Sequence, residues 1–462
     1  MTSTLTPNAT TSDTARPNPQ RRRKRITVAL GGVLGVALLA GGAFGIAGVN
    51  GSSDSNAEPV SRRISAPAAG LTGRIGGRSL EETIRELELR TESVPDDYVA
   101  WATLGLAYVQ QAHTIGDPSL YSTAERVLRT SVGLNDGDNF VAYAGLAALA
   151  AGRHDFHAAE QFAVEGLAIN PSSAMLYGVL SDAQIQLGKY DTGFSSAQRM
   201  VDLSPDTASL ARVSYTHELT GDVEQARALM QRALDAAGNP GDQAFALFQL
   251  GELSLAEGDP TTALDLNNRA LALAPDNVSA MSGRAHALGV SGQVLTAIDA
   301  YQKLVEKAPL PDYLIEFGDF LTAHGRTDHA QALYQQARAQ LELDSQNGVR
   351  ADAGIIFFEA DHGDPAKALA DAELAIQEQP FFEMYEAYAW ALYVNQRFDE
   401  AAVAIDQAKQ IGIRDAEMYV RAGLIDRARG DDDGAIREMQ HALEINPHVD
   451  QRANQMLELL GV

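Results

Sequence analysis

The stretch LGELSLAEGDPTTALDLNNRALALAP, residues 250–275, decides the fold of this chain. It contains two short helical segments, separated by a turn at Gly258 and ended by Pro275, which cannot continue a helix. Ala263 and Ala270 are small residues that let the second helix cross the first closely. The unit is therefore a helix, a glycine turn, a second helix and a proline turn.

The same unit recurs with a period of about 34 residues, which is typical of repeat arrays. We count ten units between Tyr98 and Pro447, with Ser79–Thr91 and Asp450–Leu460 expected as cap helices because terminal repeats need a solvated outer face. Successive turn glycines lie 33 to 38 residues apart, except for one double interval around Gln396. These glycines are Gly152, Gly188, Gly221, Gly258, Gly292, Gly325, Gly363 and Gly430.

This pattern resembles the tetratricopeptide repeat (TPR), which combines Leu-Gly in the first helix, Ala in the second and a closing Pro. A second unit carries the same signature at Tyr419, Gly423, Gly430, Ala435, Ala442 and Pro447. The resemblance implies an all-α fold, a solenoid of helical hairpins wound into a right-handed superhelix. It also implies a protein-protein interaction scaffold with a concave surface that holds partner proteins.

Two units depart from the pattern. The first has about seven extra residues around His113–Leu120, and the second helix of unit seven runs on through Leu341–Leu343 without a closing proline. We expect both departures to change the superhelix locally.

In the family that this sequence resembles, recurring positions of each first helix line the concave groove. Here those positions are mostly aromatic or acidic, and Arg350 and Arg427 are nearly the only cations, which argues against a clamp for a peptide carboxylate. The aromatic residues either anchor a protein or peptide partner or pack against neighbouring helices, and the sequence leaves both interpretations open. The partner-groove candidates are Tyr215, Phe245, Phe248, Glu252, His286, Phe357, Trp390 and Tyr393.

The amino-terminal part predicts a membrane anchor. Residues 1–25 form a basic tail that lacks the apolar side chains needed for folding. Residues 26–49 carry no charge, and as a transmembrane helix they would extend about 36 Å, enough for a bilayer core of about 30 Å. The basic flank places the tail in the cytoplasm, so residues 50–78 form an extracytoplasmic flexible stalk and 79–462 an extracytoplasmic solenoid. We therefore expect a single-pass cell-membrane protein.

Alternatives remain for this region. Ser55-Asn56-Ala57 resembles a signal cleavage site, which would release a secreted protein. Gly31 and Gly35, like Gly41 and Gly45, have the GxxxG spacing that lets two spans pair, so a homodimer is a further hypothesis. A cytoplasmic repeat domain is a third alternative, and it would require the basic flank to misreport the orientation.

Composition and motifs exclude several classes of function. The chain has no cysteine, and residues 79–462 carry a net charge of about −32, which argues against nucleic-acid binding. No phosphate-binding loop, zinc-protease motif or nucleophile elbow occurs, so we predict neither an enzyme nor a cofactor. The segment His154–His157 lacks further ligands, and we predict no metal. An enzyme, or a non-catalytic activator, of envelope metabolism is kept as the alternative function.

Overall fold

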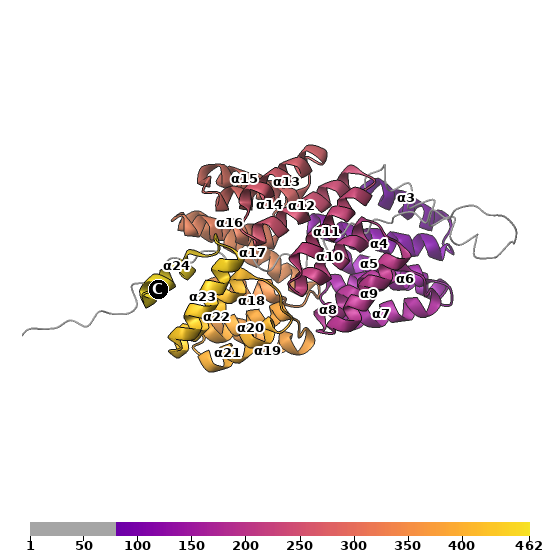
Figure 1. Ribbon diagram of the computed structural model, residues 1–462. Coiled ribbons are helices and arrows are strands. Elements are labelled where there is room, and N and C mark those ends of the chain that lie inside the picture. Colours follow the sequence, from indigo (N-terminus) through magenta and orange to yellow (C-terminus); the bar gives the residue numbers. More distant parts are fainter. Residues whose placement is uncertain (1–79) are drawn as a thin grey trace, which may run out of the picture.

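The computed structural model describes residues 80–462, which form a solenoid of α-helices (Figure 1). This described part contains 22 helices and no strand. Twenty of the helices form ten hairpins, and α3 (Leu80–Ser93) and α24 (Gln451–Leu460) flank the array. The predicted all-α, helical-hairpin solenoid is confirmed for these residues.

Each hairpin consists of one even-numbered helix followed by one odd-numbered helix. The first helices are α4 (Tyr98–Ile115), α6 (Phe140–Gly152), α8 (Ala174–Gln186), α10 (Thr207–Leu219), α12 (Pro240–Ala256), α14 (Val278–Val290), α16 (Pro311–Ala323), α18 (Ala353–His362), α20 (Phe382–Val394) and α22 (Ala416–Arg429). The second helices are α5 (Leu120–Leu134), α7 (Phe156–Ile169), α9 (Tyr190–Leu203), α11 (Val223–Ala236), α13 (Pro260–Leu273), α15 (Val294–Lys307), α17 (Thr327–Gln346), α19 (Pro365–Glu378), α21 (Phe398–Lys409) and α23 (Asp432–Ile445).

The predicted tail, span and stalk (1–25, 26–49 and 50–78) lie outside the described residues. Within residues 80–462, none of the helices is both long and apolar enough to cross a membrane.

The hairpin of α12 and α13 shows why the quoted stretch folds as it does. Gly258 adopts a φ of +77°, a left-handed conformation that glycine reaches without steric cost, and this reverses the chain after α12. The carboxylate of Asp259 then accepts a hydrogen bond from the backbone N–H of Thr262 at 3.0 Å and caps α13. Ala263 and Ala270 are fully buried where the helices cross. Turn, cap and small residues therefore act together to form the hairpin.

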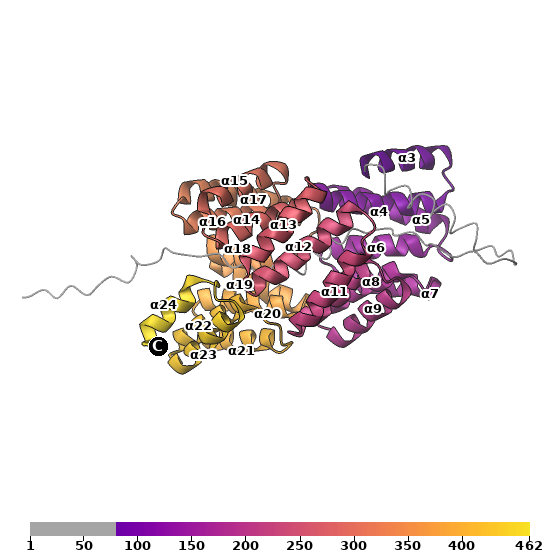
Figure 2. The same cartoon turned by 45° about the horizontal axis from the view of Figure 1, so that its top comes forward.

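After about half of the chain, the second half of the solenoid packs against the first half, and we call this packing the closure of the superhelix. In two views, the hairpins coloured orange to yellow lie beside the magenta hairpins (Figure 1, Figure 2). The backbone N–H of Phe382 donates to Tyr190 Oη at 2.8 Å, across 192 positions. The amide of Asn446 donates to the carbonyl of Leu255 at 3.0 Å, across 191 positions. Contacts at this nearly constant separation stack the second half of the solenoid on the first.

The two irregular units meet at this junction. Helix α17 extends to Gln346, which confirms the predicted run-on in unit seven. From this extension, the amide of Gln340 donates to the carbonyl of Gly116 at 3.0 Å. Gly116 lies within the extra residues of unit one, so the two departures from the repeat form one contact.

Some turn glycines reverse the chain and also contact the next turn of the superhelix. A Cβ atom at Gly188 would lie 2.5 Å from the carbonyl oxygen of Pro380, and one at Gly221 would lie 2.6 Å from that of Gly412. A Cβ at Gly292 or Gly325 would meet no atom within 4 Å. Of these four glycines, Gly188 and Gly221 therefore permit close approach between successive turns of the superhelix. Gly258 does so as well, because a Cβ there would lie 2.7 Å from Asn446 Oδ1.

We expect Gly221→Ala to destabilise the protein more than Gly325→Ala. The two glycines have φ angles of +77° and +75°, so the backbone strain of an alanine is the same, about 1–2 kcal/mol. Overpacking against Gly412 adds about 1–3 kcal/mol at position 221 alone. Chemical denaturation followed by circular dichroism measures the difference, and equal losses would show that the closure contributes little to stability.

Candidate functional site

The interior of the superhelix holds two cavities of about 550 Å³ and 300 Å³. Glu316 and Glu383 line both cavities, so the two are neighbours in one lumen. Side chains of the first helices α10, α12, α14, α16, α20 and α22 form much of the wall of the larger cavity. Its volume lies in the range typical of ligand-binding sites, about 300–1,000 Å³.

Carboxylates dominate the larger cavity. Glu218, Glu252, Glu316, Glu383 and Glu417 reach it from five different first helices. Burial, reinforced by neighbouring carboxylates, raises the pKa of Glu218, Glu252 and Glu417 to about 8. Burial likewise raises the pKa of Glu316 to about 7 and that of Glu383 well above its ordinary value. The lumen thus concentrates acidic groups that resist ionisation.

These carboxylates differ in whether their oxygens accept hydrogen bonds. Glu316 accepts hydrogen bonds from Tyr301 Oη at 2.6 Å and Ser282 Oγ at 3.1 Å. In contrast, Glu252 Oε1, Glu383 Oε1 and Glu417 Oε2 are buried without any hydrogen-bond partner. An unsatisfied buried polar atom is costly, which makes these three oxygens candidates for ligand contact.

Two other pairs of buried charges are satisfied within the solenoid. Asp182 and Arg212 form a bidentate pair, with Arg212 Nη2 3.0 Å from Asp182 Oδ2. Arg421 Nη1 pairs with Glu386 Oε1, and both side chains are almost fully buried. The Arg421 guanidinium also lies 4.5 Å from the centre of the Phe357 ring, a cation–π arrangement.

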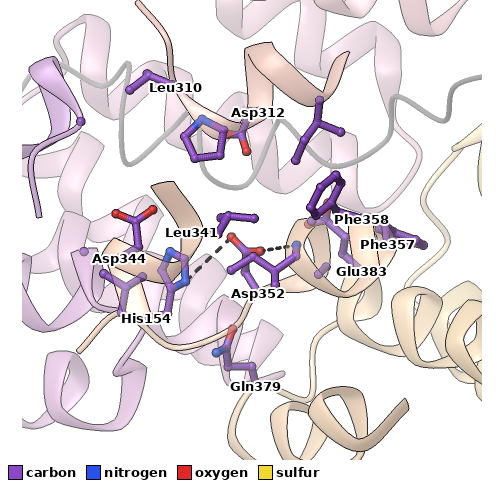
Figure 3. Close-up of a pocket in the computed structure, with 18 of the residues that line it drawn as sticks. His154, Leu310, Asp312, Leu341, Asp344, Asp352, Phe357, Phe358, Gln379 and Glu383 are labelled. Carbon is purple, nitrogen blue, oxygen red and sulfur yellow. Dashed lines mark hydrogen bonds and ion pairs between the residues drawn. The ribbon is translucent and has the colours of Figure 1, made fainter. Parts of the chain in front are cut away.

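The smaller cavity lies between α16, α17 and α18 on one side and the first hairpins, α4 to α7, on the other, and residues of α20 and α22 complete its wall (Figure 3). His154 Nδ1 lies 3.0 Å from the carbonyl oxygen of Arg350 and 3.9 Å from Asp352 Oδ2. Asp352 also caps α18 by accepting from the backbone N–H of Ile355 at 2.9 Å. Burial raises the pKa of Asp344, which lies beside His154, to about 6 (Figure 3). The predicted absence of a metal at 154–157 stays a prediction, and His154 itself joins the two turns of the superhelix.

The structure places half of the groove candidates on the lumen wall. Tyr215, Glu252 and His286 line the larger cavity, and Phe357 lines the smaller one. Burial lowers the pKa of His286 to about 4, so this imidazole is neutral near pH 7.

The other four candidates pack among helices and line neither cavity. Phe245 and Phe248 are 8% and 4% exposed. Trp390 donates from Nε1 to Asp361 Oδ1 at 2.8 Å, and its ring stacks on Tyr393 with the ring centres 4.8 Å apart. A partner-binding role for these four residues remains a prediction.

Reasoning from the sequence missed several lumen residues, among them Glu218, Glu316, Glu417 and Arg421. Glu218 and Glu417 occupy the groove positions that the family resemblance implies, so the same counting applied to units four and ten would have found them. Arg421 lies at a different position of its helix, and its burial against Glu386 depends on the neighbouring repeat. No pattern within a single repeat signals that pairing.

The lumen carboxylates are too dispersed for a metal ion. Among the described residues, no group of three or more His, Asp or Glu side chains could hold one.

Comparison with known proteins supports the repeat assignment. Residues 206–276, which include the quoted stretch, match the tetratricopeptide repeat family. The match confirms the predicted tetratricopeptide repeat over these residues. No curated protein matches the sequence.

Solved structures of repeat proteins resemble the chain with TM-scores below 0.5. A thermophilic TPR protein of Thermus thermophilus is 22% identical, with a TM-score of 0.36, over 40% of this chain and 98% of that one. Yeast Tom70 is 14% identical, with a TM-score of 0.37, over 87% of this chain and 96% of its own. The structure of the APC/C hetero-tetramer Cut9–Hcn1 is 11% identical, with a TM-score of 0.38, and the coverage is again 87% and 96%.

Proposed function

We propose that this tetratricopeptide-repeat protein is a scaffold that holds a segment of a partner protein inside its superhelical lumen. The observation that carries the proposal is the 550 Å³ cavity lined by side chains from six first helices. Concave surfaces of helical repeats commonly serve as extended binding sites. A binding role is preferred to a catalytic one because the matched family is a repeat rather than an enzyme family.

We further propose that the scaffold is anchored in a cell membrane and faces the extracytoplasmic side. Support comes from the sequence, where the basic residues 21–25 precede the charge-free residues 26–49. Release after Ala57 and a cytoplasmic repeat domain are the competing arrangements, whereas dimerisation through the glycines of the span is compatible with the anchor. Protease added to intact spheroplasts distinguishes the orientations, because full protection of the repeat domain would contradict an extracytoplasmic location.

Site-specific crosslinking tests the binding role. We expect a photo-reactive amino acid at Ala256, an exposed residue on the wall of the larger cavity, to form adducts with a partner protein in cells. The matched control is Leu295 on α15, which is 73% exposed and does not line either cavity. Mass spectrometry of the adducts identifies the partner segment. Adducts at Leu295 alone, or equal adducts at both positions, would contradict binding in the lumen.

A further inference from the structure

Glu383 is the starting point, because its environment is incomplete without a ligand. Its side chain extends from α20 to the wall shared by both cavities. It is 5% exposed, and Oε1 has no hydrogen-bond partner. Glu252 Oε1 from α12 and Glu417 Oε2 from α22 are unsatisfied in the same cavity. These three oxygens accept no hydrogen bond and lie on three separate helices. A ligand with several hydrogen-bond donors would satisfy them.

The charged side chains of the cavity indicate that the ligand carries a positive charge. Among the described residues that line the larger cavity, Arg414 is the only Arg or Lys, and its side chain is exposed. His286 contributes no positive charge, since burial lowers its pKa to about 4. Arg421 on the wall of the smaller cavity lowers the pKa of Glu383 and Glu417 in part, but its guanidinium pairs with Glu386. Acidic side chains therefore outnumber cations around the larger cavity.

The shape of the cavity indicates an organic cation. The carboxylates of the described chain do not converge on a metal-binding geometry. Apolar wall is supplied by Phe320, Phe382 and Ile413, which suits the methylene stem of a lysine or arginine side chain. An ammonium or guanidinium group at the end of such a stem carries several donors for dispersed carboxylates.

The larger cavity reaches the surface near the hydrogen bond between Asn446 and Leu255, which joins successive turns of the superhelix. Beyond it, a Cβ at Gly292 would meet no atom within 4 Å, and Gly292, His324 and Asn454 are exposed on the rim of the cavity. A flexible chain can thus enter between the α14–α15 turn and α24.

We propose that the larger cavity binds a lysine or arginine side chain on a flexible segment of the partner protein, with Glu252, Glu383 and Glu417 as its carboxylate acceptors. This inference rests on the proposed scaffold function and names the chemistry of the bound segment. It differs from a carboxylate clamp, because the lumen supplies acceptors rather than cations.

Fluorescence anisotropy with the full-length protein tests the inference. The probe is a labelled Gly-Ser peptide that carries two arginines, and its control is the same peptide with citrulline, a neutral isostere. At about pH 8 we expect the arginine peptide to bind about tenfold or more tightly than the citrulline peptide. Equal affinity of the two peptides would overturn the proposal.

Variants locate the binding. Glu252→Gln, Glu383→Gln and Glu417→Gln, combined, should weaken binding of the arginine peptide about tenfold or more, while the single Glu383→Gln variant weakens it less. The charge-matched control combines Glu224→Gln, Asp265→Asn and Glu306→Gln, three exposed residues that line neither cavity. The control should bind like the wild type, and equal weakening in both triple variants would overturn the site. Circular dichroism confirms folding of each variant.

Two further results separate the alternatives. Free spermidine that competes with the arginine peptide at equal concentration would assign the cavity to a small polyamine and overturn the peptide proposal. Crosslinks at Ala256 combined with no preference for arginine would leave the scaffold function standing and reject this inference. Arginine-dependent binding without crosslinks at Ala256 would show that the cavity binds a cation and would reject both the scaffold function and the partner segment proposed as its ligand.

Discussion

Replacing Arg421 with methionine is expected to destabilise the protein by about 3–5 kcal/mol, because it leaves the buried carboxylate of Glu386 without its partner. Both side chains are almost completely buried, at 4% and 2% exposure. The guanidinium also loses its position over the Phe357 ring. Urea denaturation followed by circular dichroism at about pH 8 measures the loss.

Two controls show whether the unpaired charge is the cause. Combining Arg421→Met with Glu386→Leu removes both charges, and this double variant should recover much of the lost stability. Arg429 pairs with Asp399, whose side chain is 90% exposed, so Arg429→Met should change stability by less than about 1 kcal/mol. A double variant as unstable as Arg421→Met would indicate that packing, rather than the charge, determines the loss.

The hairpins were predictable from the sequence because their signals are local. Gly258 reverses the chain through a positive φ angle, and Ala263 is small because a helix crosses there. Both requirements act within one repeat, so a period of about 34 residues reveals them. The run-on of α17 was predictable for the same reason, since no proline ends that helix.

The closure of the superhelix was not predictable in this way. The angle between successive hairpins is set by many small contacts, and a small change in each one accumulates over ten hairpins. Sequence reasoning therefore interpreted Gly188 and Gly221 only as turn residues, although they also make room for the backbone at Pro380 and Gly412.

The lumen depends on that closure, which explains why only part of it was anticipated. Tyr215, Glu252 and His286 were placed on the concave side by their positions within a repeat. That Glu218 of unit four shares a cavity with Glu417 of unit ten follows from the second turn of the superhelix. Positions within a repeat predict which residues face inward, but the arrangement of the repeats decides which of them meet.

Raising the pH from about 6.5 to about 9 is expected to destabilise the folded protein, because the lumen carboxyl groups lose protons that burial favours. The folded-state pKa of Glu218, Glu252 and Glu417 is about 8, above the ordinary glutamate value of 4.5. Between these values the folded state binds more protons than the unfolded state. Stability is therefore fully present below about pH 4.5 and is lost as the pH rises through about 8.

Between about pH 6.5 and 9, the titration of buried histidines contributes little to the change in stability. His113 and His286 have pKa values lowered to about 4 by burial, and an unfolded histidine titrates near 6.5, so their opposing contribution lies below the chosen range. Each carboxyl group that stays protonated in the folded state contributes about 1.4 kcal/mol per pH unit. For a domain of this size, we expect the melting temperature to fall by about 5 °C or more.

Matched variants test whether the lumen carboxyl groups cause the fall in melting temperature with pH. Glu218→Gln, Glu252→Gln and Glu417→Gln, combined, remove three of the titrating groups, so the melting temperature should fall less than that of the wild type across the same range. Glu316 and Glu383, whose pKa values burial also raises, keep part of the fall. The exposed triple variant, Glu224→Gln with Asp265→Asn and Glu306→Gln, should keep the wild-type slope because those side chains lie outside the lumen. A wild-type melting temperature that is constant across this range would show that the lumen carboxylates are already ionised in the folded protein. The three unsatisfied oxygens would then be solvated, and the case for a cationic ligand would lose its physical basis.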